Sequence, residues 1–358
     1  MNNNDGKDIP SRAVACLKSP WNDCHNTIWL ASALRLHRNI EKFKFPSKLD
    51  AERKKQIIAL VGTEYLKQSS TSPLMLKAED LSFLDREYLV EHFLLIESFN
   101  QMGIGNAFVI DDTGESLTLF NSEDHIAFIK VSTQPEFDVS WSELIKEEVQ
   151  LGKKFNFAFS SRFGFLTSDL SNCGTAFGAS AYLQLPALIH TEKINTLLET
   201  ELEDNVMVTG IQGNPSEVVG DILVVQNNYT LGVTEENICS AVRSFATRLQ
   251  NEETSLRQSM KTSPNPLLMD RVSRAFAVLC HSYQIEAVEA LNAFSLLKLG
   301  LDMGWVQGCS VAELNRLFFN CRRAHLLYQF EGKTLQEEIP HKRAEFIHKA
   351  LKKVSLLI

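Results

Sequence analysis

Cysteine and histidine are the residue types whose spacing in this sequence could indicate a metal site or a disulfide framework. The seven cysteines are scattered along the chain: Cys16, Cys24, Cys173, Cys239, Cys280, Cys309 and Cys321. An odd and scattered set is not typical of a disulfide framework. No pair has the C-x-x-C spacing of a zinc site, and Cys24 and His25 are immediate neighbours, which rarely face one metal. The pattern predicts structural thiols and no metal site.

Composition and charge limit the classes of protein to which the chain can belong. The 358 residues are 44% hydrophobic and 22% charged, which is typical of a globular protein large enough for two domains. A formal net charge of −8 argues against a nucleic-acid partner, which normally requires a basic face. No apolar run approaches the roughly 18 residues that cross a bilayer. The start, MNNNDGKDIPSR, lacks the basic-then-apolar order of a secretory signal. We therefore expect a cytoplasmic protein that binds neither nucleic acid nor membrane.

The elements that would position a site follow from the hydrophobic pattern. Apolar residues at helical spacing predict helices over 51–68, which the SSTSP sequence at 69–73 ends, and over 141–155. Residues 180–203 show helical spacing that Pro186 interrupts. Short β-branched and aromatic runs predict strands over 106–112, 116–121, 125–132, 156–160 and 221–227, with DDTG (111–114) as a hairpin turn. This mixture predicts an α+β fold in which a mostly antiparallel sheet has helices on one side.

The last hundred residues have a different character. The polar stretch 251–267 ends in Pro-Asn-Pro and predicts a linker or hinge. After it, apolar stripes at i, i+3 and i+4 predict helices over 269–284, 285–305, 310–330 and 341–357. We therefore predict two domains, an α+β domain over 1–255 and an all-α domain over 256–358.

Several segments resemble the signature segments of bacterial protein-arginine kinases in the ATP:guanido phosphotransferase family. They are WLASALRLHRNIEKFKFP (29–46), LFNSEDHIAFIKV (119–131), the stretch 157–188 around TSDLSNCGTAFGAS, and the stretch 208–238 around GNPSEVVGD. DRVSRAFAVL and LLKLGLDMGW are similar to the family's helical tail. The resemblance covers nearly the whole chain in the family's order. It implies a guanido-kinase catalytic domain, with an antiparallel sheet flanked by helices, followed by an all-α C-terminal domain. It also implies transfer of the γ-phosphoryl group of ATP to a guanidinium nitrogen.

The resemblance implies a nucleotide site for ATP with Mg²⁺, in which several arginines neutralise the triphosphate. The nucleotide-binding residues that it implies are Ser32, Arg35, Ala179, Ser180, Gly210 and Gly213. Four positions that the family fills with phosphate-binding arginines are uncharged here: Ala33, Ala127, Gly178 and Thr209. An arginine–phosphate contact contributes roughly 1.5–3 kcal/mol, so four losses predict ATP binding weaker by at least roughly four decades. Arg35 is then either a phosphate ligand or a surface or packing residue.

The guanidinium side of the implied site is also altered. In the family, carboxylates hold the guanidinium and one helps to remove a proton from it. The resemblance assigns this catalytic role to Glu123, which could equally be an ordinary carboxylate beside a strand end. Asn214 stands in place of the family's second carboxylate, and Asp169 in place of its cysteine. Asp169 could accept an arginine side chain or cap its loop, and we expect the cap. We expect His125 to stabilise its turn rather than to act in acid–base chemistry.

Framework residues of the family are retained while charged ones are absent. The retained residues are Asn172, Gly174, Thr175, Ala179, Ser180, Gly210, Gly213, Gly220, Asn227, Leu231 and Gly232. Glycines and small residues set turns and close backbone approaches, which the fold needs whatever the chemistry. The pattern therefore predicts a retained fold with an altered site.

The helical domain offers a second site by resemblance. Family members carry a phosphoarginine-binding motif, R-D-x-x-R-A, and the corresponding IPHKRA (339–344) keeps Arg343 and Ala344. His341 and Lys342 add positive charge, so anion binding at Arg343 is one reading. The other is that Pro340 begins a helix and the cations are solvated.

Three functional hypotheses follow. The first is a degenerate protein-arginine kinase homologue, a pseudokinase that binds arginine- or phosphoarginine-bearing proteins in protein quality control. The family's other partners, a small zinc-binding activator protein and Clp-type protease machinery, come with this hypothesis. The second is an active protein-arginine kinase whose site is rewired through Lys153, Lys154 and Arg162. The third is a homodimeric structural module, since helical tails in this family can pair subunits.

Overall fold

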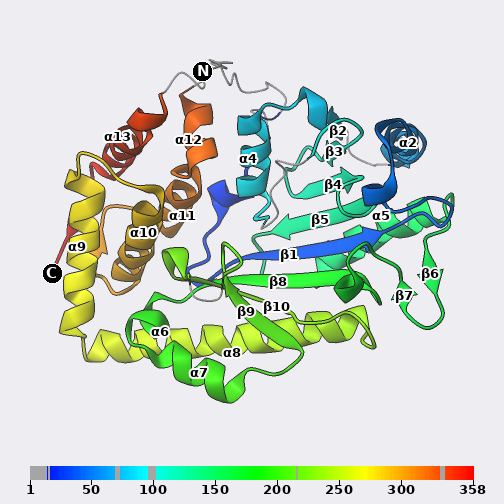
Figure 1. The fold of residues 1–358 in the computed structure, drawn as a ribbon. Coiled ribbons are helices and arrows are strands. Elements are labelled where there is room, and N and C mark those ends of the chain that lie inside the picture. Colours follow the sequence, from blue (N-terminus) through cyan, green and yellow to red (C-terminus); the bar gives the residue numbers. More distant parts are fainter. Residues whose placement is uncertain (1–13, 15–16, 69–72, 96–101, 215–216, 331–334) are drawn as a thin grey trace.

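The computed structural model describes residues 14, 17–68, 73–95, 102–214, 217–330 and 335–358. Figure 1 shows a large sheet with helices packed around it and a group of helices beside one end of it. Residues 1–12, on which the secretory-signal prediction depends, lie outside the described ranges, as do residues 69–72 of the predicted helix break.

One eight-stranded sheet forms the centre of the molecule. Its strand order is β2-β3-β4-β5-β1-β8-β10-β9, and every neighbouring pair is antiparallel. The strands are β1 (Trp29–Arg38), β2 (Leu74–Lys77), β3 (Ala107–Ile110), β4 (Ser116–Phe120), β5 (Ile126–Ser132), β8 (Phe177–Gln184), β9 (Val206–Gly210) and β10 (Ile222–Asn227). A separate hairpin pairs β6 (Phe159–Ser160) with β7 (Gly164–Phe165). The predicted antiparallel sheet is confirmed.

The turn between β3 and β4 lies at the predicted DDTG sequence. Gly114 has a φ of 72°, which favours glycine, and the Asp111 carboxylate accepts hydrogen bonds from the backbone N–H groups of Glu115 and Ser116. The sequence therefore forms this hairpin for the reason that predicted it.

Helices pack against both faces of the sheet. On one face, α5 (Asp138–Gly152) and α8 (Glu235–Thr262) form a core with strand residues such as Phe177. On the other face, α4 (Phe83–His92) and the C-terminal helices share one core with strand residues such as Val224. The remaining helices of this part are α2 (Ala51–Ile57), α3 (Thr63–Gln68), α6 (Pro186–His190) and α7 (Lys193–Glu201), with a π-helical turn, Ile58–Gly62, between α2 and α3. The prediction of helices on one side was therefore incomplete.

The C-terminal part is helical, as predicted. Its elements are α9 (Pro266–His281), α10 (Ala287–Asp302), α11 (Val311–Asn320), α12 (Arg323–Gln329) and α13 (Ile339–Leu351), with a small sheet of β11 (Val306–Gln307) and β12 (Ser355–Leu356). The single helix predicted over 310–330 is two helices, because Arg322 is extended between α11 and α12. The prediction for 180–203 was also wrong at its start, since residues 180–184 belong to β8.

The polar stretch 251–267 is not a linker over most of its length. Helix α8 continues without a break to Thr262, and α9 begins at Pro266. The predicted boundary between residues 255 and 256 lies inside α8, and the division into 1–255 and 256–358 stays a prediction.

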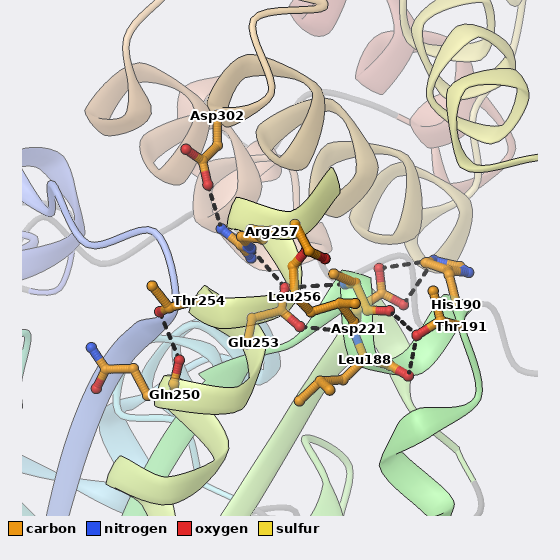
Figure 2. A network of polar contacts seen from close by, with 12 residues as sticks. Leu188, His190, Thr191, Asp221, Gln250, Glu253, Thr254, Leu256, Arg257 and Asp302 are labelled. Atoms are coloured by element: carbon orange, nitrogen blue, oxygen red, sulfur yellow. Dashed lines mark hydrogen bonds and ion pairs between the residues drawn. The ribbon is translucent and has the colours of Figure 1, made fainter. Parts of the chain in front are cut away.

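Buried charges explain why this stretch of helix is polar. Glu253 is 0% exposed and accepts hydrogen bonds from the backbone N–H groups of Ala187 and Leu188, at 3.0 and 2.8 Å. Its carboxylate also accepts from Arg257 Nε at 2.7 Å, and Arg257 reaches Asp302 of α10 at 3.3 Å (Figure 2). These contacts join α8 to α6 and α10. We call Glu253, Arg257 and Asp302 the α8 charge network.

Candidate functional site

The positions to which the resemblance assigns phosphate-binding arginines lie on one face of the sheet. Gly178 is directly opposite Arg35 where β8 pairs with β1. Ala33 precedes Arg35 by two residues, so both side chains point to the same face. On β5, Ala127 lies opposite His37, which shares that face with Arg35. The pairing thus gathers residues from three strands, β1, β5 and β8, on one face.

Thr209 of β9 lies on the same face. It is opposite Val224 of β10, and Val224 is opposite Tyr182 of β8. Tyr182 follows Gly178 by four residues on one strand, so the two share a face. We call the face that carries Ala33, Arg35, Ala127, Gly178 and Thr209 the Arg35 face.

The Arg35 face is mostly apolar and buried. Ala33, Ala127 and Val224 are each 1% exposed, and Thr209 is 3% exposed. These alanines and Val224 belong to the core that also contains Phe93 and Leu94, which follow α4. The chain after α4 therefore packs onto this face.

Arg35 is bound by the protein's own backbone. Its Nη2 donates to the carbonyl oxygen of Leu94 at 3.2 Å, and the hydroxyl of Tyr182 donates to the same oxygen at 3.0 Å. Leu94 has a φ of 51°, a left-handed conformation that costs a leucine on the order of 1–2 kcal/mol. The Leu94 carbonyl thus takes a place beside Arg35 that an anion could otherwise fill.

The other residues of the predicted nucleotide site are divided between two faces. Ser180 is opposite Ala33 and shares the Arg35 face. Ser32 and Ala179 point to the opposite face, as their neighbours in sequence require. There the Ser32 hydroxyl accepts from Trp29 Nε1 and donates to the carbonyl of Gln134. The structure therefore brings Ser180, but not the side chains of Ser32 and Ala179, together with Arg35.

Gly210 and Gly213 form a turn after β9. Gly210 N–H donates to the carbonyl of Asn214, and Gly213 N–H donates to the carbonyl of Gly210, both at 2.9 Å. A Cβ atom at Gly210 would lie 2.0 Å from the carbonyl oxygen of Glu217, so a side chain is excluded there. Close backbone approach accounts for this glycine, and the nucleotide-binding role of both glycines stays a prediction.

An acidic group lies at one end of the sheet. Glu123 is exposed in the loop from β4 to β5, and Asp169 is exposed at the start of a short 3₁₀ helix. Ser168 connects the two regions, because its hydroxyl donates to the Glu123 carbonyl at 2.6 Å and its N–H donates to Asp124 Oδ1 at 2.7 Å. Asp169 accepts from Ser171 N–H at 2.9 Å, which confirms its predicted cap. Glu123 and Asp169 therefore present two carboxylates from one connected end of the sheet.

The residues next to Glu123 are structural. Asp124 is buried, and burial raises the pKa of this carboxyl, but His37, Asn39 and Ser168 more than reverse the effect and leave it below its usual value. His125 Nδ1 accepts from Ile40 N–H at 3.0 Å, and Nε2 lies 2.9 Å from the Lys44 carbonyl. The prediction that His125 stabilises its turn is confirmed.

Arg38 and Arg343 are buried arginines with backbone partners. Arg38 donates to Glu148 at 2.8 Å and stacks over the ring of Phe165. Arg343 is 2% exposed and donates to the carbonyls of Cys321 and Ile285, each at 2.8 Å. Pro340 lies in the first turn of α13, as the second reading required, but that reading was wrong to expect a solvated Arg343. The phosphoarginine-binding role of Arg343 stays a prediction.

Sequence reasoning missed Leu94 and Tyr182. Leu94 acts through its carbonyl oxygen, which every residue type carries, and its positive φ has no signature in a leucine. Tyr182 lies in a stretch that had been predicted as helical, which concealed its place beside Arg35. Had residues 177–184 been predicted as a strand, Tyr182 could have been placed near Arg35.

The described residues show neither a metal-binding cluster nor a membrane-spanning helix. They contain no group of three or more His, Cys, Asp or Glu side chains placed to hold a metal ion. No helix among them has the length and apolar character needed to span a membrane. The described cysteines, which exclude Cys16, are free thiols.

Two family models match the chain. The C-terminal catalytic domain of ATP:guanido phosphotransferases matches residues 55–256, more than half of the chain. The chain belongs to the ATP:guanido phosphotransferase family. The C-terminal domain of the protein-arginine kinase McsB matches residues 265–356, which places the chain in the bacterial branch of this family.

Relatives within the ATP:guanido phosphotransferase family align over most of the chain. A protein-arginine kinase from Halothermothrix orenii is 33% identical over 321 residues, which cover 89% of this chain and 92% of the relative. A protein-arginine kinase from Chlamydia pneumoniae is 30% identical over 338 residues, covering 92% and 93%. The chain is therefore a homologue of protein-arginine kinases.

Solved structures of ATP:guanido phosphotransferases share the fold. The substrate-free duplicated taurocyamine kinase from Schistosoma mansoni superposes with a TM-score of 0.57 at 22% identity, over 78% of this chain. This chain spans 42% of that duplicated kinase. Lombricine kinase superposes with a TM-score of 0.56 at 17% identity, over 72% of this chain and 74% of its own. These similarities confirm the guanido-kinase fold.

Proposed function

We propose that this chain is a protein-arginine kinase homologue that acts mainly by binding. It would hold arginine- or phosphoarginine-bearing proteins as an adaptor in protein quality control. It would transfer the γ-phosphoryl group of ATP far more slowly than relatives with a complete set of arginines.

The Arg35 face carries this proposal. A triphosphate bears about four negative charges, and transfer from it depends on cations that neutralise them. Of the five positions that define the face, Arg35 alone is charged, and its guanidinium already donates to the Leu94 carbonyl. Buried apolar groups cannot replace the solvation that phosphate oxygens lose. The residues of this face therefore do not fit ATP, and we derive no catalytic step through it.

The acidic end of the sheet supports the binding half of the proposal. Glu123 and Asp169 are exposed carboxylates on segments that Ser168 connects. Carboxylates and guanidinium groups form charge-assisted hydrogen bonds of good geometry, so an arginine side chain is a suitable ligand for this end. Such binding needs no phosphate site.

The relatives of this chain suggest its partners. The relatives are protein-arginine kinases, so we propose protein arginine side chains as the ligand class, with ATP as the nucleotide of any residual activity. A zinc-binding activator protein, Clp-type protease machinery and a second copy of the chain are further candidates that the family suggests. A cytoplasmic location accompanies these partners.

The competing proposal is an active kinase with other cations in place of the missing arginines. Lys153 and Lys154 are exposed just after α5, and α5 packs against the face opposite Arg35. The Arg162 guanidinium lies over the ring of Phe163 in the hairpin between β6 and β7. This placement favours the binding proposal, because the two lysines follow a helix on the other side of the sheet.

A kinase assay tests the catalytic half. Full-length protein is incubated with ATP, Mg²⁺ and an arginine-rich unfolded protein, and phosphoarginine is measured by ³¹P NMR beside a protein-arginine kinase relative. We expect at least roughly a thousandfold less phosphoarginine than the relative forms, since four lost contacts predict about four decades. Formation at the relative's rate would refute the proposal.

A peptide titration tests the binding half. We expect an arginine-bearing peptide to bind more tightly than its lysine analogue, and Glu123→Gln to weaken the arginine peptide about tenfold. Glu136→Gln is the matched control, because Glu136 is exposed and lies outside the acidic end. Equal affinities for the two peptides, or equal effects of the two substitutions, would contradict arginine binding at Glu123.

A further inference from the structure

A cavity of about 500 Å³ lies among the N-terminal segment, α4 and the C-terminal helices α11, α12 and α13. Its lining combines aromatic and polar side chains, including Tyr88, Tyr328, Phe346, Ser19, Arg316 and His325. None of the described residues that line it is acidic. The volume lies within the range of small-molecule sites. It is separate from the Arg35 face and from the acidic end of the sheet.

His325 gives this cavity a buried acceptor. The side chain is 3% exposed, and its Nδ1 lies 2.7 Å from the Glu91 carboxylate. Burial lowers the pKa of His325, and Arg322 lowers it further, although the hydrogen bond to Glu91 opposes both. A neutral ring that donates from Nδ1 to the Glu91 carboxylate leaves Nε2 as an acceptor.

The other ring nitrogen of His325 lacks a partner. Its Nε2 has no hydrogen bond to any residue that the structure describes, and neither has the buried hydroxyl oxygen of Ser19, which also lines the cavity. Buried polar atoms are nearly always paired, so an unpaired acceptor in a residue that lines a cavity indicates a missing donor. A ligand that donates an O–H or N–H group would supply it.

Arg316 gives the cavity a cation. Its side chain is exposed, and it forms no ion pair or hydrogen bond with the part of the chain that the structure describes. Hydrogen bonds from Ser310 lower the pKa of Glu313, one turn earlier on α11, and the charge of Arg316 lowers it further. An anionic group on a ligand would therefore meet a guanidinium that has no hydrogen-bonded partner among the described residues.

We propose that this cavity is an effector site for a small aromatic carboxylate that also carries an O–H or N–H donor. The ring packs among Tyr88, Tyr328 and Phe346, the donor meets His325 Nε2, and the carboxylate meets Arg316. The proposal stands apart from the proposed function, because it uses none of the residues of the Arg35 face or of Glu123.

Direct contacts link this cavity to the Arg35 face. Glu91 of α4 accepts from the backbone N–H groups of Ala324 and His325, both at 3.1 Å, so it fixes the start of α12 against α4. Three residues after Glu91, Leu94 presents its carbonyl to Arg35. A ligand that holds His325 therefore holds α4 and, through it, the segment over Arg35. Tighter binding of this segment is the effect that distinguishes an effector site from a passive cavity.

The binding test uses 4-hydroxyphenylacetate as the probe, titrated into the full-length protein and followed by NMR signals of the probe and of labelled tyrosine and phenylalanine side chains. We expect a dissociation constant of about 1 mM or tighter. Phenylacetate, which lacks the donor, should bind about tenfold more weakly because Nε2 stays unpaired. Absence of saturation at about ten times that concentration would overturn the proposal.

Two variants locate the site. Arg316→Gln should weaken 4-hydroxyphenylacetate about fivefold and leave its uncharged amide analogue unchanged. Arg274→Gln is the matched control, because Arg274 is an exposed arginine on α9 away from the cavity. Equal effects of the two substitutions would place the probe elsewhere and overturn the assignment, as would saturable binding that neither affects.

Hydrogen exchange tests the effector role. Saturating probe should slow exchange of the amides of Phe93, Leu94 and Leu95 about threefold or more, because it stabilises the α4–α12 contact. The same experiment with Arg316→Gln at equal probe concentration should show a smaller effect. Bound probe with unchanged exchange in this segment would overturn the effector role.

Discussion

The α8 charge network and the Arg35 face differ in how many charged side chains they contain and in how these are paired. In the network, Glu253 and Arg257 are 0% and 3% exposed, and each charged group has partners within 3.3 Å. On the Arg35 face, four positions are uncharged and the single arginine donates to a backbone carbonyl. Both regions are buried, so burial alone does not explain the difference.

The contrast shows that this chain keeps buried charges in the α8 charge network, where their desolvation is offset by close partners. A buried ion pair is expensive to desolvate and is held only with good geometry and further hydrogen bonds. The network meets that condition and joins three helices. The Arg35 face carries no comparable set, and its alanines pack as core. Buried charged residues are therefore few on the Arg35 face but present elsewhere in the described structure.

The largest effect is expected from breaking the network. Glu253→Ala leaves the Arg257 guanidinium and two backbone N–H groups buried without the carboxylate that they share. We expect the free energy of unfolding to fall by about 3–5 kcal/mol, measured by urea denaturation. Glu252→Ala is the control, because its exposed side chain should change stability by less than about 0.5 kcal/mol. Similar losses in both variants would remove the contrast between the regions.

Lys298 is a buried lysine whose hydrogen-bond partner, Asn315, is neutral. Its Nζ donates to Asn315 Oδ1 at 2.8 Å, and burial lowers the pKa of Lys298 to about 7. Between pH 7 and about 10.4, the unfolded chain binds one proton more than the folded chain, so stability rises with pH by up to about 1.4 kcal/mol per unit.

Lys298→Met should remove this rise and stabilise the protein at pH 7. Urea denaturation at several pH values measures both effects, and Lys349→Met serves as an exposed control. An unchanged pH dependence in Lys298→Met would mean that Lys298 is charged in the folded protein at pH 8 and above.

Gly178→Arg sharpens the account of the Arg35 face. A Cβ atom at Gly178 would meet its nearest neighbours, Arg35 Cβ and Asn227 Oδ1, at 3.9 Å, so the first atom of a side chain is accommodated without a clash. An added arginine–phosphate contact of about 1.5–3 kcal/mol should tighten ATP binding tenfold or more, measured by calorimetry. Gly178→Gln adds bulk without charge and should not. Equal ATP affinities in the two variants would contradict the view that missing cations limit this face.

The smallest effect concerns the contact that covers Arg35. Tyr182→Phe removes the hydroxyl that donates to the Leu94 carbonyl, which should lower stability by about 0.5–1.5 kcal/mol. Exchange of the amides of Phe93 and Leu94 should become faster. Tyr229→Phe, at an exposed tyrosine, should change neither quantity. Unchanged exchange in Tyr182→Phe would show that Arg35 alone holds the segment.

The sequence predicted the parts of the fold whose pattern is local. The strands β3, β4 and β5 are short β-branched and aromatic runs around a glycine turn, and the C-terminal helices carry regular apolar stripes. The central strand β1 was missed because its sequence, WLASALRLHR, contains no β-branched residue. The linker prediction failed because Glu253 and Arg257 look like surface residues until their partners, 45 to 66 residues away, are known.

The site was predictable where side-chain identity decides it. The uncharged residues at 33, 127, 178 and 209 are visible in the sequence, and the cap formed by Asp169 follows from its type. The common face of these residues required the strand register, and the contact of Leu94 with Arg35 required backbone geometry. Neither leaves a trace in the order of amino acids.

Calorimetry of ATP binding to the purified full-length protein, with and without Mg²⁺, is the decisive experiment. We expect no saturable heat at millimolar ATP under either condition, because the Arg35 face offers a single guanidinium, which already donates to the Leu94 carbonyl. Binding near the micromolar range would contradict it, since a site of that affinity would require cations that this face does not carry.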